Sequence, residues 1–258
     1  MKLAIETLGC GEDLVMVHGW GMNSSVWHDF AEQLAGHYRV TLIDLPGHGH
    51  SSYSGASSLE AWAQACLDAA PENAVWLGWS LGAMVTIQAT ILMPQRVKGL
   101  LIMAGMPKFI QDENWPHAMA LRTLNQFNEM LGGDMNRALE RFLALQMLGS
   151  DLAVERLRSI KIRLRERPEP SLEALQEGLE LLRQSDLREK LHLISCPTAW
   201  IYGERDTLAP AAASETLKQW LPDARTHTIS RAAHTPFLSH PSETEGLLLS
   251  CLEAWHEC

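Results

Sequence analysis

The chain has 258 residues, of which 46% are hydrophobic and 20% charged, so it is not a disordered chain and can fold as one large domain or two small ones. Its 21 Lys and Arg against 31 Asp and Glu give a net charge of −10, which disfavours binding to nucleic acid. No apolar run reaches the length of a membrane helix, no export signal is visible at the N-terminus, and the five cysteines form no CxxC pair. We therefore expect a cytoplasmic protein with free thiols.

Short apolar runs alternate with helical patterns along most of the chain, which is typical of a parallel α/β sheet. The predicted strands are residues 13–19, 38–49 (a strand that runs into a Pro/Gly-rich loop), 74–80, 97–105, 197–206 and 224–230. A helix is predicted over 81–93, where Pro94 ends it, and two more over 216–221 and 242–257. The fold class is therefore predicted to be α/β.

The middle of the chain follows another pattern. From Pro107 to Lys190 the apolar residues recur with the 3.6-residue period of a helix, and the strand pattern returns over 188–202. One apolar helix face holds residues 138, 142 and 145, and a second holds 153, 157, 160 and 164. We expect a core domain of residues 1–106 and 191–258, interrupted by an all-helical lid over 107–190.

Residues 78–82 read Gly-Trp-Ser-Leu-Gly and match the pattern G-x-S-x-G. A strand is predicted before them and a helix after them, and this context distinguishes a nucleophile turn from a chance Gly/Ser turn. Such a turn lifts Ser80 above the sheet at the N-terminus of a helix, where free N–H groups favour a developing oxyanion. The pattern predicts Ser80 as the nucleophile.

A serine hydroxyl needs a base, and the base needs a carboxylate that orients it. His234 lies between the last predicted strand and the last helix, where the order serine, acid, histidine puts the base. His240 is interpreted as structural. Asp206 lies at the end of the predicted strand segment 197–206 and is the predicted acid, with Glu204 as a competitor. Asp44 precedes the serine in the chain and is interpreted as a loop anchor.

An oxyanion hole needs two backbone N–H groups. One is predicted to be that of Leu81, directly after the nucleophile. The other is predicted to be that of Trp20, in the loop His18-Gly19-Trp20-Gly21 that follows the apolar strand residues 13–17. His18 itself is interpreted as shaping this loop and not as a second base.

The motifs HGWGMNSSVW, DLPGHGHS, WLGWSLGAMV, YGERD and AAHTPFLSHP, in this order, resemble the α/β-hydrolase superfamily. The resemblance implies a mostly parallel central sheet flanked by helices, with an inserted lid. HGWG, WLGWSLG and RFLALQMLG (141–149) resemble more closely the carboxylesterases of biotin synthesis. That likeness implies hydrolysis of the methyl ester of a pimeloyl chain carried on acyl carrier protein. It places substrate contacts at Trp20, Ser80, Leu81, Phe142, Leu143, Ala144, Leu145, Gln146 and His234.

Basic residues gather in the middle of this acidic chain. The segment 137–167 holds eight Lys and Arg against four Asp and Glu, a net charge of +4. A basic lid suits an acidic partner such as acyl carrier protein, and the alternative is a solvated helix surface. We expect Arg137, Arg141 and Arg158 to contact the carrier. A family arginine in this patch corresponds to Val154 here.

Other functions remain open on the same residues. A different serine hydrolase on this scaffold, such as a short-chain esterase or a carbon–carbon bond hydrolase, would share the nucleophile turn. A ligand receptor with an inert pocket is the alternative outside enzymes. The sequence contains neither HExxH nor GxGxxG, so we expect no metal, no nucleotide cofactor, no membrane or nucleic-acid partner, and a monomer.

Overall fold

The computed structural model describes residues 1–55, 58–149 and 153–256, and in these ranges all side chains except those of 153–157 and 256. A seven-stranded sheet forms the centre, and every neighbouring pair is parallel except β1 with β3. Its order is β1 (Ile5–Leu8), β3 (Tyr38–Ile43), β2 (Glu12–Val17), β4 (Ala74–Trp79), β5 (Val97–Met103), β6 (Thr198–Gly203) and β7 (Arg225–Ile229).

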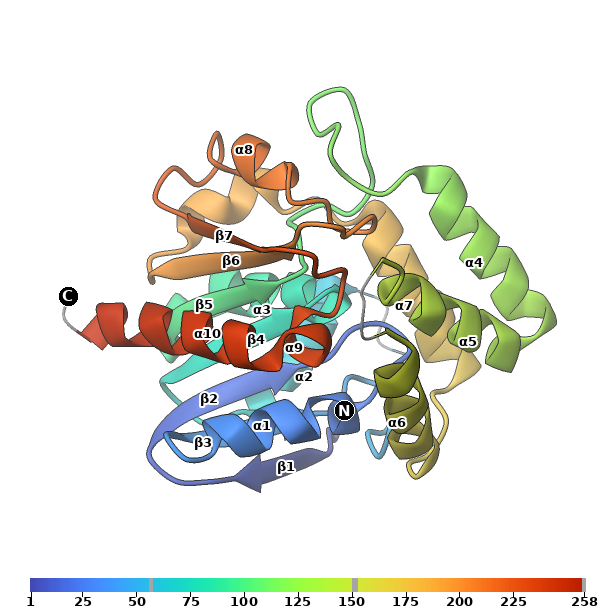
Figure 1. The fold of residues 1–258 in the computed structure, drawn as a ribbon, viewed down its shortest axis with the longest axis horizontal. Helices are drawn as coiled ribbons and strands as arrows, with labels where there is room; N and C mark the ends of the chain where they lie inside the picture. Colours follow the sequence, from blue (N-terminus) through green and yellow to red (C-terminus); the bar gives the residue numbers. More distant parts are fainter. Residues whose placement is uncertain (56–57, 150–152, 257–258) are drawn as a thin grey trace.

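Helices cover both faces of the sheet (Figure 1). On one face lie α1 (His28–Leu34) and α10 (Pro241–His256), and on the other lie α2 (Leu59–Ala69) and α3 (Leu81–Leu92). Short elements complete the core, namely α8 (Ala213–Leu217), α9 (Pro236–Ser239) and the 3-10 helices η1 (Ser24–Trp27), η2 (Pro94–Arg96) and η3 (Arg188–Leu193). Because helices cover both of its faces, β4 is buried along its whole length, which explains its continuous apolar run.

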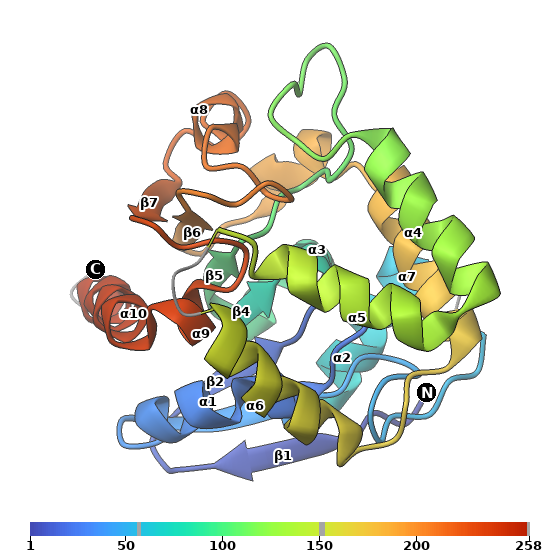
Figure 2. The same ribbon diagram turned by 45° about the vertical axis from the view of Figure 1, so that its right-hand side comes forward.

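Among the described residues, four α-helices lie between β5 and β6 and gather on one side of the molecule (Figure 2). They are α4 (Leu121–Gly133), α5 (Met135–Gln146), α6 (Ala153–Arg165) and α7 (Leu172–Gln184). Their contacts lie at the carboxyl ends of β2 and β4, because Gly21 packs against Leu139 and Leu175 while Gly178 packs against Trp20 and Leu81. The inserted helices therefore stand over the edge of the sheet at which the predicted nucleophile lies.

Three sequence expectations about elements are wrong. Residues 188–193 form the 3-10 helix η3, and β6 begins only at Thr198, after Pro197. The helix expected at 216–221 begins at Ala213 and ends at Leu217. The helical period expected from Pro107 begins at Leu121, because residues 107–120 form a loop with isolated bridges from Ile110 to Met119 and from Asp112 to Trp115. The sequence also left β1, α1 and α2 unassigned.

Cys10, Cys66, Cys196 and Cys251 are free thiols, as expected, and Cys258 lies outside the described residues. None of the helices within the described ranges has the length and apolar character needed to cross a membrane.

Candidate active site

The turn between β4 and α3 holds Ser80 in an unusual backbone conformation, with φ 57° and ψ −120°. Its N–H donates to the carbonyl of Met103 (3.2 Å). A Cβ on Gly78 would collide with Thr86, and one on Gly82 would collide with the backbone of Val17. The two glycines of the motif are therefore required by close approach, since the strained serine persists only where the neighbouring backbone fixes it.

Three side chains from distant parts of the chain meet at this turn. Ser80 Oγ lies 2.9 Å from His234 Nε2, and His234 Nδ1 lies 2.7 Å from Asp206 Oδ2. The other oxygen of Asp206 accepts hydrogen bonds from the backbone N–H groups of Leu208 (2.8 Å) and Ala209 (3.0 Å). All three side chains are buried, at most 5% exposed, so the series is shielded from solvent and held in one orientation.

The loop that carries His234 is fixed from two sides. Trp79 donates from its indole Nε1 to the carbonyl of His234 (2.8 Å). The N–H of His234 donates to the carbonyl of Gln146 at the end of α5 (3.1 Å). The imidazole is therefore positioned by the core of the fold through Trp79 and by the inserted helices through Gln146.

The alternative residues lie elsewhere. Glu204 is exposed and accepts hydrogen bonds from the Arg231 N–H (2.7 Å) and the Ser230 hydroxyl (3.0 Å), which hold the pKa of its carboxyl below the usual value. His240 ends α9 and contacts the hydroxyl of Ser239 through Nδ1 (2.8 Å). These two groups are bonded locally and do not join the series that ends at the serine.

The loop after β2 is held by hydrogen bonds on both sides of Trp20. His18 Nδ1 donates to the carbonyl of Gly19 (2.8 Å), and its Nε2 accepts from the N–H of Leu45 (2.9 Å), so His18 shapes the loop. The indole of Trp20 donates to the carbonyl of Leu175 on α7 (2.8 Å). Within the described part of the chain, no hydrogen bond occupies the backbone N–H of Trp20 or Leu81.

Helix α5 brings an aromatic wall to this loop. Phe142 is buried and meets Trp20 edge to face, with ring centroids 4.8 Å apart, and it also meets Phe127 of α4 edge to face, with centroids 5.1 Å apart. Gln146 is fully buried, and both polar atoms of its side chain have no hydrogen-bond partner among the described residues. The wall therefore combines an apolar surface with one buried amide that is open to a further partner.

The other residues of α5 expected at the substrate differ in exposure. Leu145 is half-buried against the core, and Leu143 is buried and lines a cavity of about 100 Å³ between α5 and α6. Gly21 and Met22 form the opposite side of that cavity. Ala144 lies on the exposed side of α5, where it does not face the cavity.

The basic residues of 137–167 divide into two groups. Four of them form ion pairs within the chain: Arg163 with Asp29, Lys161 and Arg165 with Glu140, and Arg167 with Glu6. The side chains of Arg137, Arg141 and Arg158 are exposed and have no ion pair among the described residues. The side chains of Val154 and Arg156 lie outside the described residues.

Sequence reasoning missed two contacts of the site. The bond from Trp79 to His234 joins residues 155 positions apart, and that from Arg167 to the loop after β2 joins residues 143 apart. No local pattern indicates either contact.

Among the described residues, no group of three or more His, Cys, Asp or Glu is arranged to hold a metal ion.

Known proteins are similar to this chain in sequence and in fold. A family model described as the alpha/beta hydrolase fold matches residues 14–241. Two relatives are named pimeloyl-[acyl-carrier protein] methyl ester esterase. The one from Aeromonas salmonicida is 41% identical and covers 94% of this chain and 96% of its own. That from Serratia marcescens is 44% identical, over 92% and 93%. An esterase structure from Exiguobacterium antarcticum, at 20% identity, superposes with a TM-score of 0.88 over 97% of this chain and 95% of its own, which supports the fold.

Proposed function

This chain belongs to the α/β-hydrolase family and, within it, to the pimeloyl-[acyl-carrier protein] methyl ester esterases, and we propose from this that it is a serine carboxylesterase of biotin synthesis. It hydrolyses the methyl ester of pimeloyl-acyl carrier protein to methanol and the free carboxylate. The proposed serine-hydrolase chemistry rests on the hydrogen-bonded series of Ser80, His234 and Asp206 at the strained turn.

In the acylation step, Ser80 Oγ attacks the ester carbonyl carbon while His234 Nε2 accepts the hydroxyl proton. Asp206 keeps the imidazole in the tautomer that has a lone pair on Nε2 and stabilises the imidazolium that forms. The carbonyl oxygen becomes an oxyanion, for which the unoccupied N–H groups of Trp20 and Leu81 are the proposed donors.

The intermediate collapses when His234 returns the proton to the methoxy oxygen and methanol leaves. Water then attacks the acyl-serine, with His234 accepting a proton from it, and the second collapse restores Ser80 and frees the carboxylate. The step consumes one water and needs no cofactor.

The inserted helices, which we treat as a lid over residues 107–190, supply the proposed binding surface for the acyl chain. The edge-to-face pair of Trp20 and Phe142 offers an apolar wall beside the serine, and the cavity beside Gly21 and Leu143 continues it between α5 and α6. The unpartnered amide of Gln146 would pair with a polar group of the bound substrate, because a buried polar group without a partner is costly.

The carrier is proposed to dock on Arg137, Arg141 and Arg158, which are exposed and form no ion pair with any described residue. The four paired cations of the patch share the three carboxylates of Asp29, Glu140 and Glu6, so these three arginines supply most of the positive charge that the described carboxylates do not offset. Charge of this kind raises the encounter rate with an acidic partner more than it raises affinity.

The test is hydrolysis of the pimeloyl methyl ester on acyl carrier protein, followed by release of methanol. We expect a higher kcat/KM than for shorter and longer dicarboxylic homologues on the same carrier, and than for the free pimelate methyl ester. Faster cleavage of a carbon–carbon diketone than of any ester would instead identify a different hydrolase. Failure of a fluorophosphonate to label Ser80 would identify an inert receptor.

A further inference from the structure

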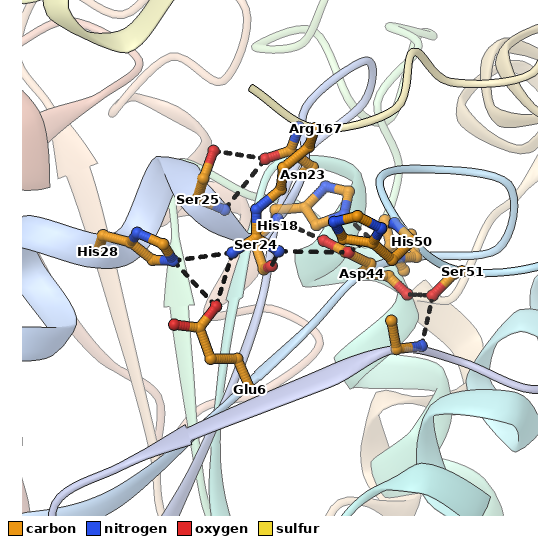
Figure 3. A network of polar contacts seen from close by, with 12 residues as sticks. Glu6, His18, Asn23, Ser24, Ser25, His28, Asp44, His50, Ser51 and Arg167 are labelled. Carbon is orange, nitrogen blue, oxygen red and sulfur yellow. Dashed lines mark hydrogen bonds and ion pairs between the residues drawn. The ribbon is translucent and has the colours of Figure 1, made fainter. Parts of the chain in front are cut away.

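A polar network joins the loop after β2 to the segment that follows α6 (Figure 3). Several of its residues line an open cavity of about 590 Å³. Arg167 is its centre. Nη1 of Arg167 donates to the hydroxyl of Ser24 (2.9 Å), and Nη2 donates to Glu6 Oε2 (2.6 Å) and to His28 Nε2 (3.0 Å). The guanidinium is thus bonded to three core segments, while its own backbone belongs to the inserted part of the chain.

The buried acid of the network is Asp44, which is 1% exposed. One oxygen accepts from the N–H of Ser24 (2.6 Å) and the other from the N–H of His50 (3.0 Å). Burial alone would raise the pKa of Asp44, but the neighbouring His18 and then the N–H groups of His50 and Ser24 hold it below the usual value, so it is ionised. Nη1 of Arg167 lies 3.6 Å from this carboxylate.

That guanidinium is a permanently charged cation at ion-pair distance from Asp44. His18 also lies near the carboxylate, but burial lowers its pKa and the ring is neutral at pH 7. Among the described residues, no Lys or Arg other than Arg167 lies at ion-pair distance from Asp44. An unbalanced buried carboxylate is costly, so loss of the guanidinium would shift the groups that Asp44 holds.

Those groups belong to the loop that carries Trp20. Ser24 follows Trp20 by four positions and is held twice, through its N–H by Asp44 and through its hydroxyl by Arg167. The neighbouring Asn23 donates from Nδ2 to the carbonyl of Leu164 on α6 (3.4 Å). The loop therefore takes part of its position from the inserted segment 164–167.

We propose that Arg167 is a positioning residue for ester hydrolysis: it holds Ser24 and balances Asp44, and so fixes the backbone N–H of Trp20 where the oxyanion forms. The inference rests on the proposed serine-esterase function. An oxyanion donor displaced by a fraction of an ångström stabilises the transition state less while leaving the ground state bound as before. A fall in kcat with little change in KM is the expected signature.

The test compares Arg167→Met with Arg163→Met. Both substitutions remove a guanidinium that ties the end of α6 to the core, but Arg163 pairs with Asp29 on α1 (2.5 Å) and makes no contact with Ser24 or Asp44. Arg167→Lys keeps the charge that faces Asp44, and Ser24→Ala removes only the hydroxyl. The substrate is p-nitrophenyl acetate, which needs no carrier.

We expect Arg167→Met to lower kcat about tenfold with KM nearly unchanged. Inhibition by an alkyl trifluoromethyl ketone should weaken by about the same factor, because the adduct of this ketone with Ser80 carries an oxyanion that the proposed oxyanion hole binds. Arg167→Lys should recover part of this loss, and Arg163→Met should change neither quantity. If Arg167→Met does not fold, judged by its melting temperature, Ser24→Ala should lower kcat in the same direction.

Equal losses in Arg163→Met and Arg167→Met would overturn the proposal, because they would reflect a general loosening of α6. Wild-type kcat in both Arg167→Met and Ser24→Ala would overturn it as well. A wild-type protein that cleaves p-nitrophenyl acetate but not the carrier-bound methyl ester would contradict the proposed substrate alone and leave the role of Arg167 to the variants.

Discussion

The indole of Trp79 and the backbone of His234 are joined by a hydrogen bond of 2.8 Å, and their rings lie 5.9 Å apart. Trp79 directly precedes Ser80, the proposed nucleophile, so one contact joins the turn that holds this serine to the loop that carries His234, the proposed base. The ring of Trp79 also packs edge to face on Trp27 (6.0 Å) and Phe237 (5.1 Å). The separation of serine and histidine is therefore set by the aromatic core as well as by their own hydrogen bond.

Trp79→Phe tests this link. It keeps an aromatic ring and removes the N–H, which should lower the free energy of unfolding by about 1 kcal/mol for the hydrogen bond and lower kcat severalfold. Trp76→Phe is the matched control, because Trp76 is equally buried and its Nε1 has no partner among the described residues. Urea denaturation and ester turnover measure the two effects. Equal kcat losses in the two variants would show that packing alone matters.

The roles proposed for Ser80, Asp206 and Glu204 predict different outcomes when each residue is substituted. Ser80→Ala should lower kcat by several orders of magnitude with the fold intact, and Asp206→Asn should also cost orders of magnitude, because the imidazole then adopts the wrong tautomer. Glu204→Gln should leave kcat near wild type, since Glu204 is bonded to Ser230 and Arg231. A silent Asp206→Asn together with an inactive Glu204→Gln would reverse the assignment of the acid.

The sequence could predict the features that rest on local pattern. The buried runs of β2, β4, β5 and β6 and the glycines around Ser80 have few alternatives, and the expected order of serine, acid and base picks out residues that lie within hydrogen-bond distance in the fold. Strands with weak patterns were missed, such as β1, whose burial alternates between exposed and intermediate at the sheet edge. The stretch 188–194 carries apolar residues that suit a strand or a helix equally, so its 3-10 turn could not be predicted.

The ion pairs of the basic segment 137–167 could not be predicted from the sequence either. Composition shows eight cations between 137 and 167 but not which carboxylates face them. Glu140 lies on the same segment and is shared by Lys161 and Arg165, so its one charge offsets only one of these two cations, while Asp29 and Glu6 reach the patch from the N-terminal part of the chain. Only folding brings these groups together, so the free basic surface is smaller than the sequence indicates.

Buried histidines make stability depend on pH. Burial lowers the pKa of His48 to about 3, whereas an unfolded histidine titrates near 6.5. Below about pH 6.5 the unfolded chain therefore binds a proton that the folded chain does not, and stability falls as the pH falls toward 3. The loss for this one residue approaches about 1.4 kcal/mol per pH unit once the unfolded histidine is fully protonated.

His48→Asn isolates this effect. The amide can replace Nδ1 of the ring, which bonds to the carbonyl of Pro46 (2.9 Å), but it does not titrate. Urea denaturation between pH 7 and pH 4.5 should show a shallower loss of stability in the variant, while His18, whose pKa is also lowered by burial, continues to contribute in both proteins. Identical slopes for the two proteins would contradict a neutral His48 in the folded state.

The proposed docking surface for the carrier, Arg137, Arg141 and Arg158, is tested by reversing its charge. Arg137→Glu combined with Arg141→Glu should lower kcat/KM for the carrier-bound ester, and the loss should be greater at low salt, because attraction between exposed charges is screened within about 8–10 Å at physiological ionic strength. The same protein should hydrolyse p-nitrophenyl acetate at nearly the wild-type rate, since both arginines lie on the exposed side of α5. Kinetics on the two substrates at two salt concentrations measure the difference.

Lys190→Glu combined with Lys218→Glu is the control, because it makes the same change in net charge at two exposed residues outside the helices α4–α7. If the arginines meet an acidic carrier locally, this control should lose far less kcat/KM on the carrier-bound ester than the arginine pair does. Equal losses in the two double variants would mean that the net charge of the protein steers the carrier and not the α5 surface. Equal losses of the arginine variant on both substrates would mean that the inserted helices themselves had been disturbed.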